Sequence, residues 1–363
     1  LLGKTVIPDT HPNSAGGLGL LGALGGQEAI EQCDTLFMIG TSFPYSGYLP
    51  KPGEARGVQL DIDQTRIGLR FPVEVGLVGD SQATLRALLP LIQRKSDRAF
   101  LERIQKKTRE WNRALEEEGT SMVTPMKPQV VAWALNELAA PDAIVTTDSG
   151  TITTWIARNW FAKEGHMFSC SGNLATMAPG LPYAIGAQAA FPHRQVIAFV
   201  GDGGFTMLMG EMMTAVKYHL PIKVIIIKNN YLGQIKWEQI VFLGNPEFGV
   251  DLQPADFAAW ARAAGAAGFH VDDPAQVKET MRQFLAVPGP AVLEAEVDAN
   301  VPPLPPKIKP EQAAMFAKAL ARGQRNGPQI ALTAFREKFS EMLGESEDRG
   351  VIGRLADAAT GRS

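Results

Sequence analysis

The sequence predicts an α/β protein built from two doubly wound, parallel-sheet domains. Short apolar runs alternate with helix-compatible stretches along most of the chain, which is typical of this fold class. Four of the runs, between residues 142 and 297, are apolar almost throughout, as strands are when both faces of a parallel sheet are covered. The 363 residues, 45% of them apolar, are enough for two cores of ordinary domain size.

The first domain is predicted over residues 1–95. The runs "DTLFMIG" (34–40) and "GVQLDID" (57–63) are predicted strands with a Gly- and Pro-rich segment between them. Leucines at helical spacing in "SQATLRALLPLI" (81–92) predict the helix that closes this unit. Because the chain opens without Met, in what looks like the middle of a strand and loop, we expect this domain to be incomplete at its N-terminus.

A charged segment over 96–125 separates the two predicted domains and is interpreted as a solvated linker helix. The second domain is predicted over 126–300, and the remainder, 301–363, as a C-terminal extension that wraps around it. The four predicted strands of the second domain are "DAIVTTDSG" (142–150), "RQVIAFVGDGG" (194–204), "IKVIIIKNN" (222–230) and "PAVLEAEV" (290–297).

Composition favours small-molecule chemistry in the cytoplasm. The net charge of −3 and the scattered Lys and Arg give no electrostatic case for binding nucleic acid. Cys33 and Cys170 are the two cysteines, far apart and outside any C-x-x-C pair, which argues against a disulfide scaffold or a zinc site. The five histidines stand in no ligand spacing, and no run is apolar over the roughly 18 residues that cross a bilayer.

The segment Gly201-Asp202-Gly203-Gly204 stands where the second predicted strand ends and a helix begins. Its glycines let the backbone approach a phosphate, to which the helix N-terminus offers N–H donors. Because an acid there would repel a phosphate, Asp202 implies a cation between them, and Mg²⁺ is the cation that keeps substrate phosphates in its shell. The alternative is a plain turn in which Asp202 caps the helix.

Asn229 stands 229 − 202 = 27 residues beyond Asp202, at the end of the next predicted strand. This glycine-rich turn, followed by one helix, one strand and an Asn pair, resembles the signature of enzymes that depend on thiamine diphosphate (ThDP). The resemblance implies that Asp202, Asn229 and the backbone carbonyl of Tyr231 hold the metal that binds the diphosphate. Asn230 is the alternative to Asn229, and the resemblance places Asn230, Leu232 and Gly233 beside the cofactor with Gly203 and Gly204.

Two further stretches resemble the same family. In "GNLATMAPGLPYAIGAQAAFP" (172–192), Ala175 and Ala178 replace two family glycines. The likeness implies a catalytic part for Met177, which would bend the cofactor, and for Ala175, whose carbonyl with the Met177 N–H would bind the pyrimidine next to Thr176. A methionine that fills a core gap is the alternative. "TTDSGTITTW" (146–155) resembles a strand-end loop in which Gly150 and Thr151 bind the diphosphate.

The first domain contains "GLGLLG" (17–22), a G-x-G-x-x-G without the strand before it or the acid after it that a dinucleotide fold needs. With "GTSFPY" (40–45) and "LDIDQTRIG" (60–68), it resembles instead the middle domain of flavin-containing ThDP enzymes. The implied FAD-binding residues are Gly17, Leu18, Gly19, Leu20, Gly40, Thr41, Ser42, Phe43, Pro44 and Leu60.

Across residues 15–320 the likeness within the family is greatest to pyruvate oxidases and quinone-linked pyruvate dehydrogenases. It implies oxidative decarboxylation of a 2-oxo acid such as pyruvate, with ThDP, Mg²⁺ and FAD, and with a quinone or oxygen as the final electron acceptor. In this family an N-terminal pyrimidine-binding domain from a partner subunit supplies the activating glutamate. We therefore expect a homodimer or homotetramer for the full protein and no turnover from residues 1–363 alone.

Three alternatives stay open at this point. An acetolactate synthase-like carboligase or a non-oxidative decarboxylase would share the metal motif, and a non-catalytic scaffold could bind ThDP without turnover. A weak peripheral contact with the inner face of the membrane is also considered, because Ala331, Phe335, Phe339 and Met342 would lie on one stripe of a C-terminal helix.

Overall fold

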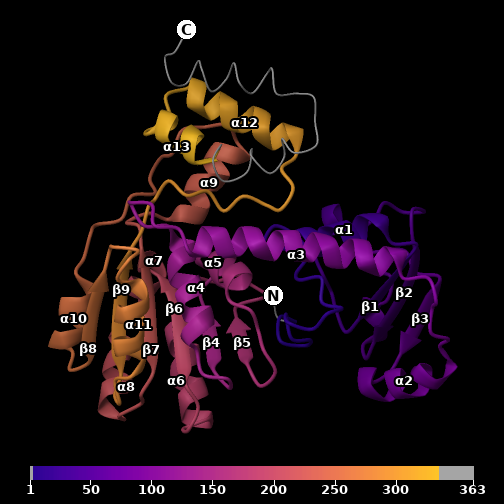
Figure 1. The fold of residues 1–363 in the computed structure, drawn as a ribbon, viewed down its shortest axis with the longest axis horizontal. Coiled ribbons are helices and arrows are strands. Elements are labelled where there is room, and N and C mark those ends of the chain that lie inside the picture. Colours follow the sequence, from indigo (N-terminus) through magenta and orange to yellow (C-terminus); the bar gives the residue numbers. More distant parts are fainter. Residues whose placement is uncertain (1–2, 335–363) are drawn as a thin grey trace. The chain divides into compact units, whose positions relative to one another are not determined.

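The computed structural model describes residues 3–334, which form two compact units (Figure 1). Residues 11–114 form the smaller unit, and residues 3–10 with 115–334 form the larger one. The sequence pattern had assigned 3–10 to the first domain, so their grouping with the second is a difference. The cause is hydrogen bonding to a distant part of the chain. Lys4 Nζ donates to the Ala157 carbonyl and the Asp9 N–H donates to the Ala162 carbonyl, both at 2.8 Å.

The larger unit contains a six-stranded sheet in the order β5-β4-β6-β7-β9-β8, and every neighbouring pair is parallel. The α/β parallel-sheet fold predicted from the sequence is therefore confirmed. The strands are β4 (Ile144–Thr147), β5 (Met167–Cys170), β6 (Val196–Gly201), β7 (Lys223–Lys228), β8 (Ala267–Val271) and β9 (Ala291–Glu296).

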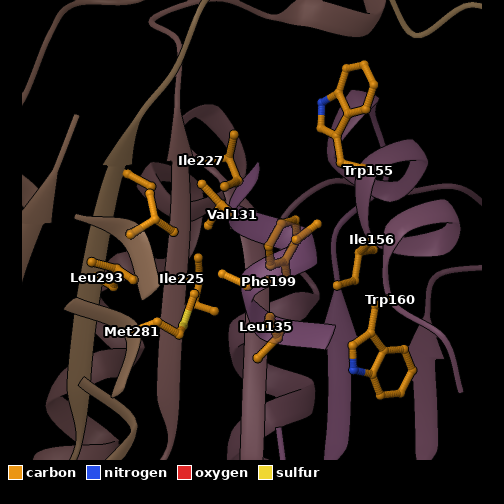
Figure 2. Packing of buried hydrophobic residues seen from close by; sticks show 14 of the residues in the cluster. Val131, Leu135, Trp155, Ile156, Trp160, Phe199, Ile225, Ile227, Met281 and Leu293 are labelled. Atoms are coloured by element: carbon orange, nitrogen blue, oxygen red, sulfur yellow. The ribbon is translucent and has the colours of Figure 1, made fainter. Parts of the chain in front are cut away.

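Both faces of this sheet are covered, because alternate residues of its inner strands enter two different cores. On one face, Phe199 and Ile225 pack with Val131 and Leu135 of α4 (Pro128–Leu138), as Figure 2 shows. On the other face, Val200 and its neighbours pack against α6 (Gly180–Ala190), α7 (Asp202–Leu208), α8 (Met212–Lys217) and α10 (Phe257–Ala263). This arrangement explains why the inner strands read as continuous apolar runs.

The helices of the larger unit follow the strands in the doubly wound pattern. Helices α4, α5 and α11 contribute to the first core, and α12 and α13 pack against α9 through Ala319 and Ile330. The helices are α4 (Pro128–Leu138), α5 (Thr151–Asn159), α6 (Gly180–Ala190), α7 (Asp202–Leu208), α8 (Met212–Lys217), α9 (Gly233–Val241), α10 (Phe257–Ala263), α11 (Val277–Leu285), α12 (Pro310–Ala321) and α13 (Gly327–Ala334).

The smaller unit contains a three-stranded parallel sheet in the order β1-β2-β3. Its core gathers around Leu36, Met38 and Phe71, and α3 buries Ile104 on one side, so the charged segment is not solvated all round. The elements are α1 (Leu24–Gln32), β1 (Thr35–Ile39), β2 (Arg56–Asp61), β3 (Val75–Val78) and α2 (Ser81–Leu88), and α3 (Ala99–Gly119) belongs to this unit up to residue 114 and to the larger unit beyond it.

Three strands were absent from the sequence prediction, namely β3, β5 and β8. Each is the outermost strand on one side of its sheet as described, where side chains are partly exposed. Met167 of β5, for example, is 40% exposed. Short, mixed sequences such as "MFSC" and "AGFHV" therefore lack the continuous apolar signal that marked β4, β6, β7 and β9.

Candidate functional site

The strand order places a crevice at the carboxyl ends of β4 and β6. The chain goes from β4 to β5 on one side and then returns past β4 to β6 on the other, which makes this point a topological switch. Ligands of doubly wound sheets bind outside the strand ends at such a point. The turns that follow β4, β6 and β7, three adjacent strands, meet here.

Asp202 is the first residue of α7 and is only 5% exposed. Its Oδ2 accepts the backbone N–H groups of Asn229 at 3.0 Å and Asn230 at 2.6 Å, and its Oδ1 accepts the N–H of Gly203 at 2.8 Å. Burial raises the pKa of this carboxyl, and the three N–H groups oppose the rise. The carboxylate thus ties the end of β6 directly to the end of β7.

The turn after β7 is held in an unusual conformation. Asn230 has φ +58°, a left-handed value that Asn tolerates better than most residues. The Asn229 side-chain oxygen accepts the Tyr231 N–H at 3.0 Å, which leaves it a second lone pair for another partner. Leu232 N–H and the Asn230 carbonyl pair with the 250–252 segment, so this turn is fixed on both sides.

The loop that carries Met177 lies against the turn after β4. The Ser149 N–H donates to the Thr176 carbonyl at 3.3 Å. Ala175 has φ +50° and Ala178 has φ +73°, so both alanines that replace family glycines keep a backbone that glycine prefers. Met177 is half-buried between them.

A cavity of about 240 Å³ opens where these turns meet. Thr176 and Asn230 are the two predicted residues of this domain that do not line it. The predicted residues that do are Gly150, Thr151, Ala175, Met177, Asp202, Gly203, Gly204, Asn229, Tyr231, Leu232 and Gly233.

Several residues on this cavity were missed from the sequence. Trp155, the last residue of the quoted "TTDSGTITTW", lines the cavity and also packs in the core on one face of the sheet, where it is only 4% exposed. Asp148, which is 1% exposed, stands in the quoted "TTDSG", but only its glycine and the following threonine were singled out. An acid directly after an apolar strand was the signal available. Gly201, part of the motif noted in the sequence, lines the cavity too, and the other missed residues are Ser149, Ile152, Ile227, Gln234 and Ile235.

Uncapped helix starts and glycines that leave space make the cavity fit a bound diphosphate. Helices α5 and α9 begin here, after Gly150 and Leu232, and neither start has a capping side chain among the described residues. Their first N–H groups therefore remain available to an anion. A Cβ on Gly150 or Gly201 would meet no protein atom within 4 Å, so both glycines leave open the space that a ligand would occupy.

The same cavity fits a hard cation only through mixed oxygen ligands. Within residues 3–334, no three His, Cys, Asp or Glu side chains lie close enough together to hold a metal ion. Asp202 supplies one carboxylate, and the amide of Asn229 and the carbonyl of Tyr231 are further oxygens of the kind that Mg²⁺ accepts when phosphate completes its shell. The donor set is therefore compatible with Mg²⁺ and unsuited to zinc.

Two buried ion pairs lie next to the turn after β7 and hold its neighbouring elements in place. Lys228 Nζ lies 2.6 Å from Glu294 Oε1; burial alone would lower the Lys228 pKa, but this carboxylate outweighs it and raises the pKa. Lys236 Nζ lies 3.2 Å from Glu247 Oε2, with both side chains at most 3% exposed, and 4.3 Å from the Tyr231 ring centre. Both pairs fix the elements next to Asn229 and Tyr231.

The runs predicted to bind FAD lie in the smaller unit, and the structure brings them together there. The Gly40 N–H donates to the Leu60 carbonyl at 2.9 Å, at the carboxyl ends of β1 and β2. A Cβ on Gly19 would lie 3.4 Å from the Phe43 ring, which places the 17–20 loop beside the 40–44 run. Their convergence is compatible with a flavin site, and FAD binding stays a prediction.

The predicted membrane stripe falls largely outside the described structure. Phe335, Phe339 and Met342 lie beyond residue 334, and Ala331 alone is described. Among the residues that are described, none of the helices combines the length and apolarity that a membrane span requires.

Comparison with known families matches two parts of the chain. Residues 148–295 match the family described as thiamine pyrophosphate enzyme, C-terminal TPP binding domain. Residues 1–88 match the one described as thiamine pyrophosphate enzyme, central domain. Thiamine pyrophosphate is ThDP under another name, so the cavity falls within the first match and the predicted flavin runs within the second.

Three relatives illustrate the range of similar proteins. The chain is 44% identical to "Putative thiamine pyrophosphate-containing protein YdaP" of Bacillus subtilis, over 94% of this chain and 58% of that protein. It is 31% identical to "Probable acetolactate synthase large subunit" of Methanocaldococcus jannaschii (84% and 54%), and 27% identical to "Pyruvate oxidase" of Lactiplantibacillus plantarum (86% and 53%). The chain thus spans a little over half the length of these relatives.

Proposed function

We propose, on the premise that this chain belongs to the thiamine pyrophosphate enzymes, that its whole protein decarboxylates a 2-oxo acid with ThDP and Mg²⁺. Pyruvate is the substrate we favour, and FAD is the group to which the electrons pass before a quinone or oxygen takes them. The active protein is a homodimer or homotetramer, and its location is the cytoplasm.

One observation carries the proposal. At a single cavity, a buried carboxylate and an amide from adjacent strand ends meet the open N-termini of two helices. Open helix starts attract an anion, whereas the Asp202 carboxylate repels one. A divalent cation bound to a diphosphate would satisfy both, because Asp202 and Asn229 would hold the cation and the helix starts would bind the phosphate groups.

The residues of this chain have distinct parts in that arrangement. Asp202, Asn229 and the Tyr231 carbonyl hold the cation, while Gly150 and Thr151 receive the diphosphate at the start of α5. Met177 borders the cavity next to Ala175 and is suited to hold the cofactor's rings bent. When bound, ThDP supplies a nucleophilic carbon for the substrate carbonyl and accepts the electron pair that CO₂ leaves behind.

Two rival activities stay open because the relatives differ in their names. One is called pyruvate oxidase and another acetolactate synthase, so a carboligase or a non-oxidative decarboxylase is the nearest alternative. The flavin runs of the smaller unit favour the oxidative reaction, since they place three glycine-rich or turn segments at the carboxyl end of one sheet. A scaffold that binds ThDP without turnover is the third possibility.

The test uses the full-length protein with ThDP, Mg²⁺ and pyruvate. We expect CO₂ release coupled to the reduction of an artificial electron acceptor, together with a flavin absorption band. CO₂ release with acetolactate as product and no acceptor reduction would point to the carboligase. Absence of CO₂ release with ThDP bound would point to the scaffold, and steady turnover by residues 1–363 alone would contradict our expectation that this chain is inactive.

A further inference from the structure

Asp148 is a buried carboxylate for which the proposed cofactor site has no use. It follows β4 directly and is 1% exposed, and its Oδ1 accepts the Gly180 N–H at 2.8 Å. Its Oδ2 has no hydrogen-bond partner among the described residues. Burial raises the pKa of this carboxyl to about 6, and the N–H groups of Gly180 and, more weakly, Gly201 oppose the rise. Burying a carboxylate oxygen without a partner costs free energy.

The Gly180 N–H is the first of α6, so it has no acceptor within its own helix. The preceding residue, Pro179, offers no capping side chain. Asp148 therefore caps α6 from another segment of the chain, 32 residues away. The start of α6 is fixed to the end of β4 by this bond.

The segment between these two points carries Met177. It is held to the turn after β4 at Thr176, by the Ser149 N–H, and at Gly180, by Asp148. Met177 lies between the two attachments, one residue from the first and three from the second. With Ala175 and Ala178 in left-handed conformations, the segment has little freedom of its own.

The glycines around Asp148 show that its position is tightly defined. A Cβ on Gly204, in α7, would lie 2.0 Å from Asp148 Oδ2, and a Cβ on Gly180 would lie 3.0 Å from Oδ1. The carboxylate thus fits into space that two other elements leave by lacking side chains. Replacing either glycine would displace it.

We propose that Asp148 is a positioning residue for Met177, acting through its hydrogen bond to Gly180. Resting on the proposed function, this assigns to Asp148 the task of holding the Met177 segment in the shape that receives ThDP. Asp148 does not touch the cofactor in this account. The acceptor oxygen is what matters, so an asparagine at this position keeps the function and an alanine loses it.

The experiment compares Asp148→Ala and Asp148→Asn in the full-length protein, without cofactor, by two NMR measurements. The first is the ¹³C-methyl signal of Met177, assigned by its loss in Met177→Leu. The second is the amide exchange rate of Gly180. Asp142→Ala is the matched control, because Asp142 is an exposed acid just before the other end of β4.

We expect slow Gly180 exchange in the wild type, in Asp148→Asn and in Asp142→Ala. In Asp148→Ala, Gly180 exchange should accelerate at least tenfold, and the Met177 methyl signal should move towards the position of a mobile methionine. Unchanged signals in Asp148→Ala, or equal loss in the alanine and asparagine variants, would overturn the proposal. Should Asp148→Ala not fold, fast Gly180 exchange in the folded wild type would overturn it alone.

A binding measurement then separates this inference from the proposed function. With ThDP and Mg²⁺, tryptophan fluorescence should give a Kd for Asp148→Ala at least tenfold above the wild type, and for Asp148→Asn within threefold. An equal Kd for the alanine variant overturns the link between Asp148 and the cofactor. If the wild type binds no ThDP, the proposed function fails, and the two NMR measurements still decide whether Asp148 positions Met177.

Discussion

Three helix starts at the same side of the six-stranded sheet differ in how their N–H groups are satisfied. At α10, Asp256 accepts the Ala259 N–H at 2.7 Å, and Glu294 accepts those of Phe257 and Ala258 at 2.7 and 3.1 Å. At α5 and α9, no capping side chain of the described chain does so. Buried donors are normally paired. At α10 the protein's own side chains accept the N–H groups, whereas α5 and α9 leave N–H donors for a ligand.

The same contrast separates the acids. Glu294 faces Lys228 and two N–H groups, and all its partners belong to the protein. Asp202 faces three N–H groups but no cationic side chain of residues 3–334, and it lies on the cavity wall. Glu294, which is paired with a lysine of the protein, therefore has a structural role. Asp202 lacks such a counter-charge, which indicates a site for a cation.

The largest expected effect comes from removing that acid. Asp202→Ala should weaken Mg²⁺-dependent ThDP binding by about 100-fold or more, because the loss of one charged ligand costs about 3 kcal/mol or more. Calorimetric titration measures the change. Asp256→Ala is the matched control at the capped helix, and equal weakening in both variants would erase the distinction between the acid on the cavity and the acid that only caps a helix.

Filling the open space at α5 should have the next largest effect. Gly150 has φ +127°, so Gly150→Ala strains the backbone by about 1 kcal/mol or more and places a methyl group in the cavity. We expect ThDP binding to weaken about tenfold. Gly289→Ala, at a loop glycine whose Cβ would also meet nothing within 4 Å, should leave the Kd unchanged; a matching loss there would contradict the explanation.

The two lysines of β7 differ in the same way, and the difference predicts how stability depends on pH. Lys223, at the other end of the strand from Lys228, is 3% exposed and donates only to carbonyls, and burial lowers its pKa to about 8. Between pH 8 and 10.5 the unfolded chain binds more protons at this residue, so its contribution to stability rises with pH. The slope is at most about 1.4 kcal/mol per pH unit.

Urea unfolding of the wild type and Lys223→Met at pH 7, 8.5 and 10 measures this contribution. The difference in unfolding free energy between the two should shift in favour of the wild type as pH rises above 8. A difference independent of pH would mean that Lys223 is not neutralised by burial.

The smallest effect is expected at the capped start of α10. Asp256→Ala should lower the unfolding free energy by about 1 kcal/mol, since it removes one capping bond. Thermal melting measures this loss, and ThDP affinity should remain at the wild-type value. A melting temperature equal to the wild type would show that this cap contributes nothing.

The sequence was informative where one short pattern reflects one physical requirement. Continuous apolar runs located β4, β6, β7 and β9, because strands covered on both faces leave no room for polar residues. The interval from Asp202 to Asn229 indicated two adjacent strand ends, and the structure joins them by a hydrogen bond of 3.0 Å. Edge strands such as β5 escaped notice because partial exposure permits mixed sequences.

Asp148 shows what a single sequence does not reveal. Its place directly after an apolar strand makes it a candidate, but its burial and its bond to Gly180 depend on two segments 32 residues apart in the sequence. Nothing in the sequence shows that Trp155 borders a cavity, since its side chain packs in the core as well as in the cavity wall. Both required the fold itself.

The most direct test of the central claim is a calorimetric titration of the full-length protein with ThDP, once in Mg²⁺ and once in EDTA. Because Asp202 repels the diphosphate unless a cation lies between them, we predict binding in Mg²⁺ and at least 100-fold weaker binding in EDTA. Equally tight binding in both buffers, or none in Mg²⁺, would contradict the assignment of this cavity to a metal-bound diphosphate.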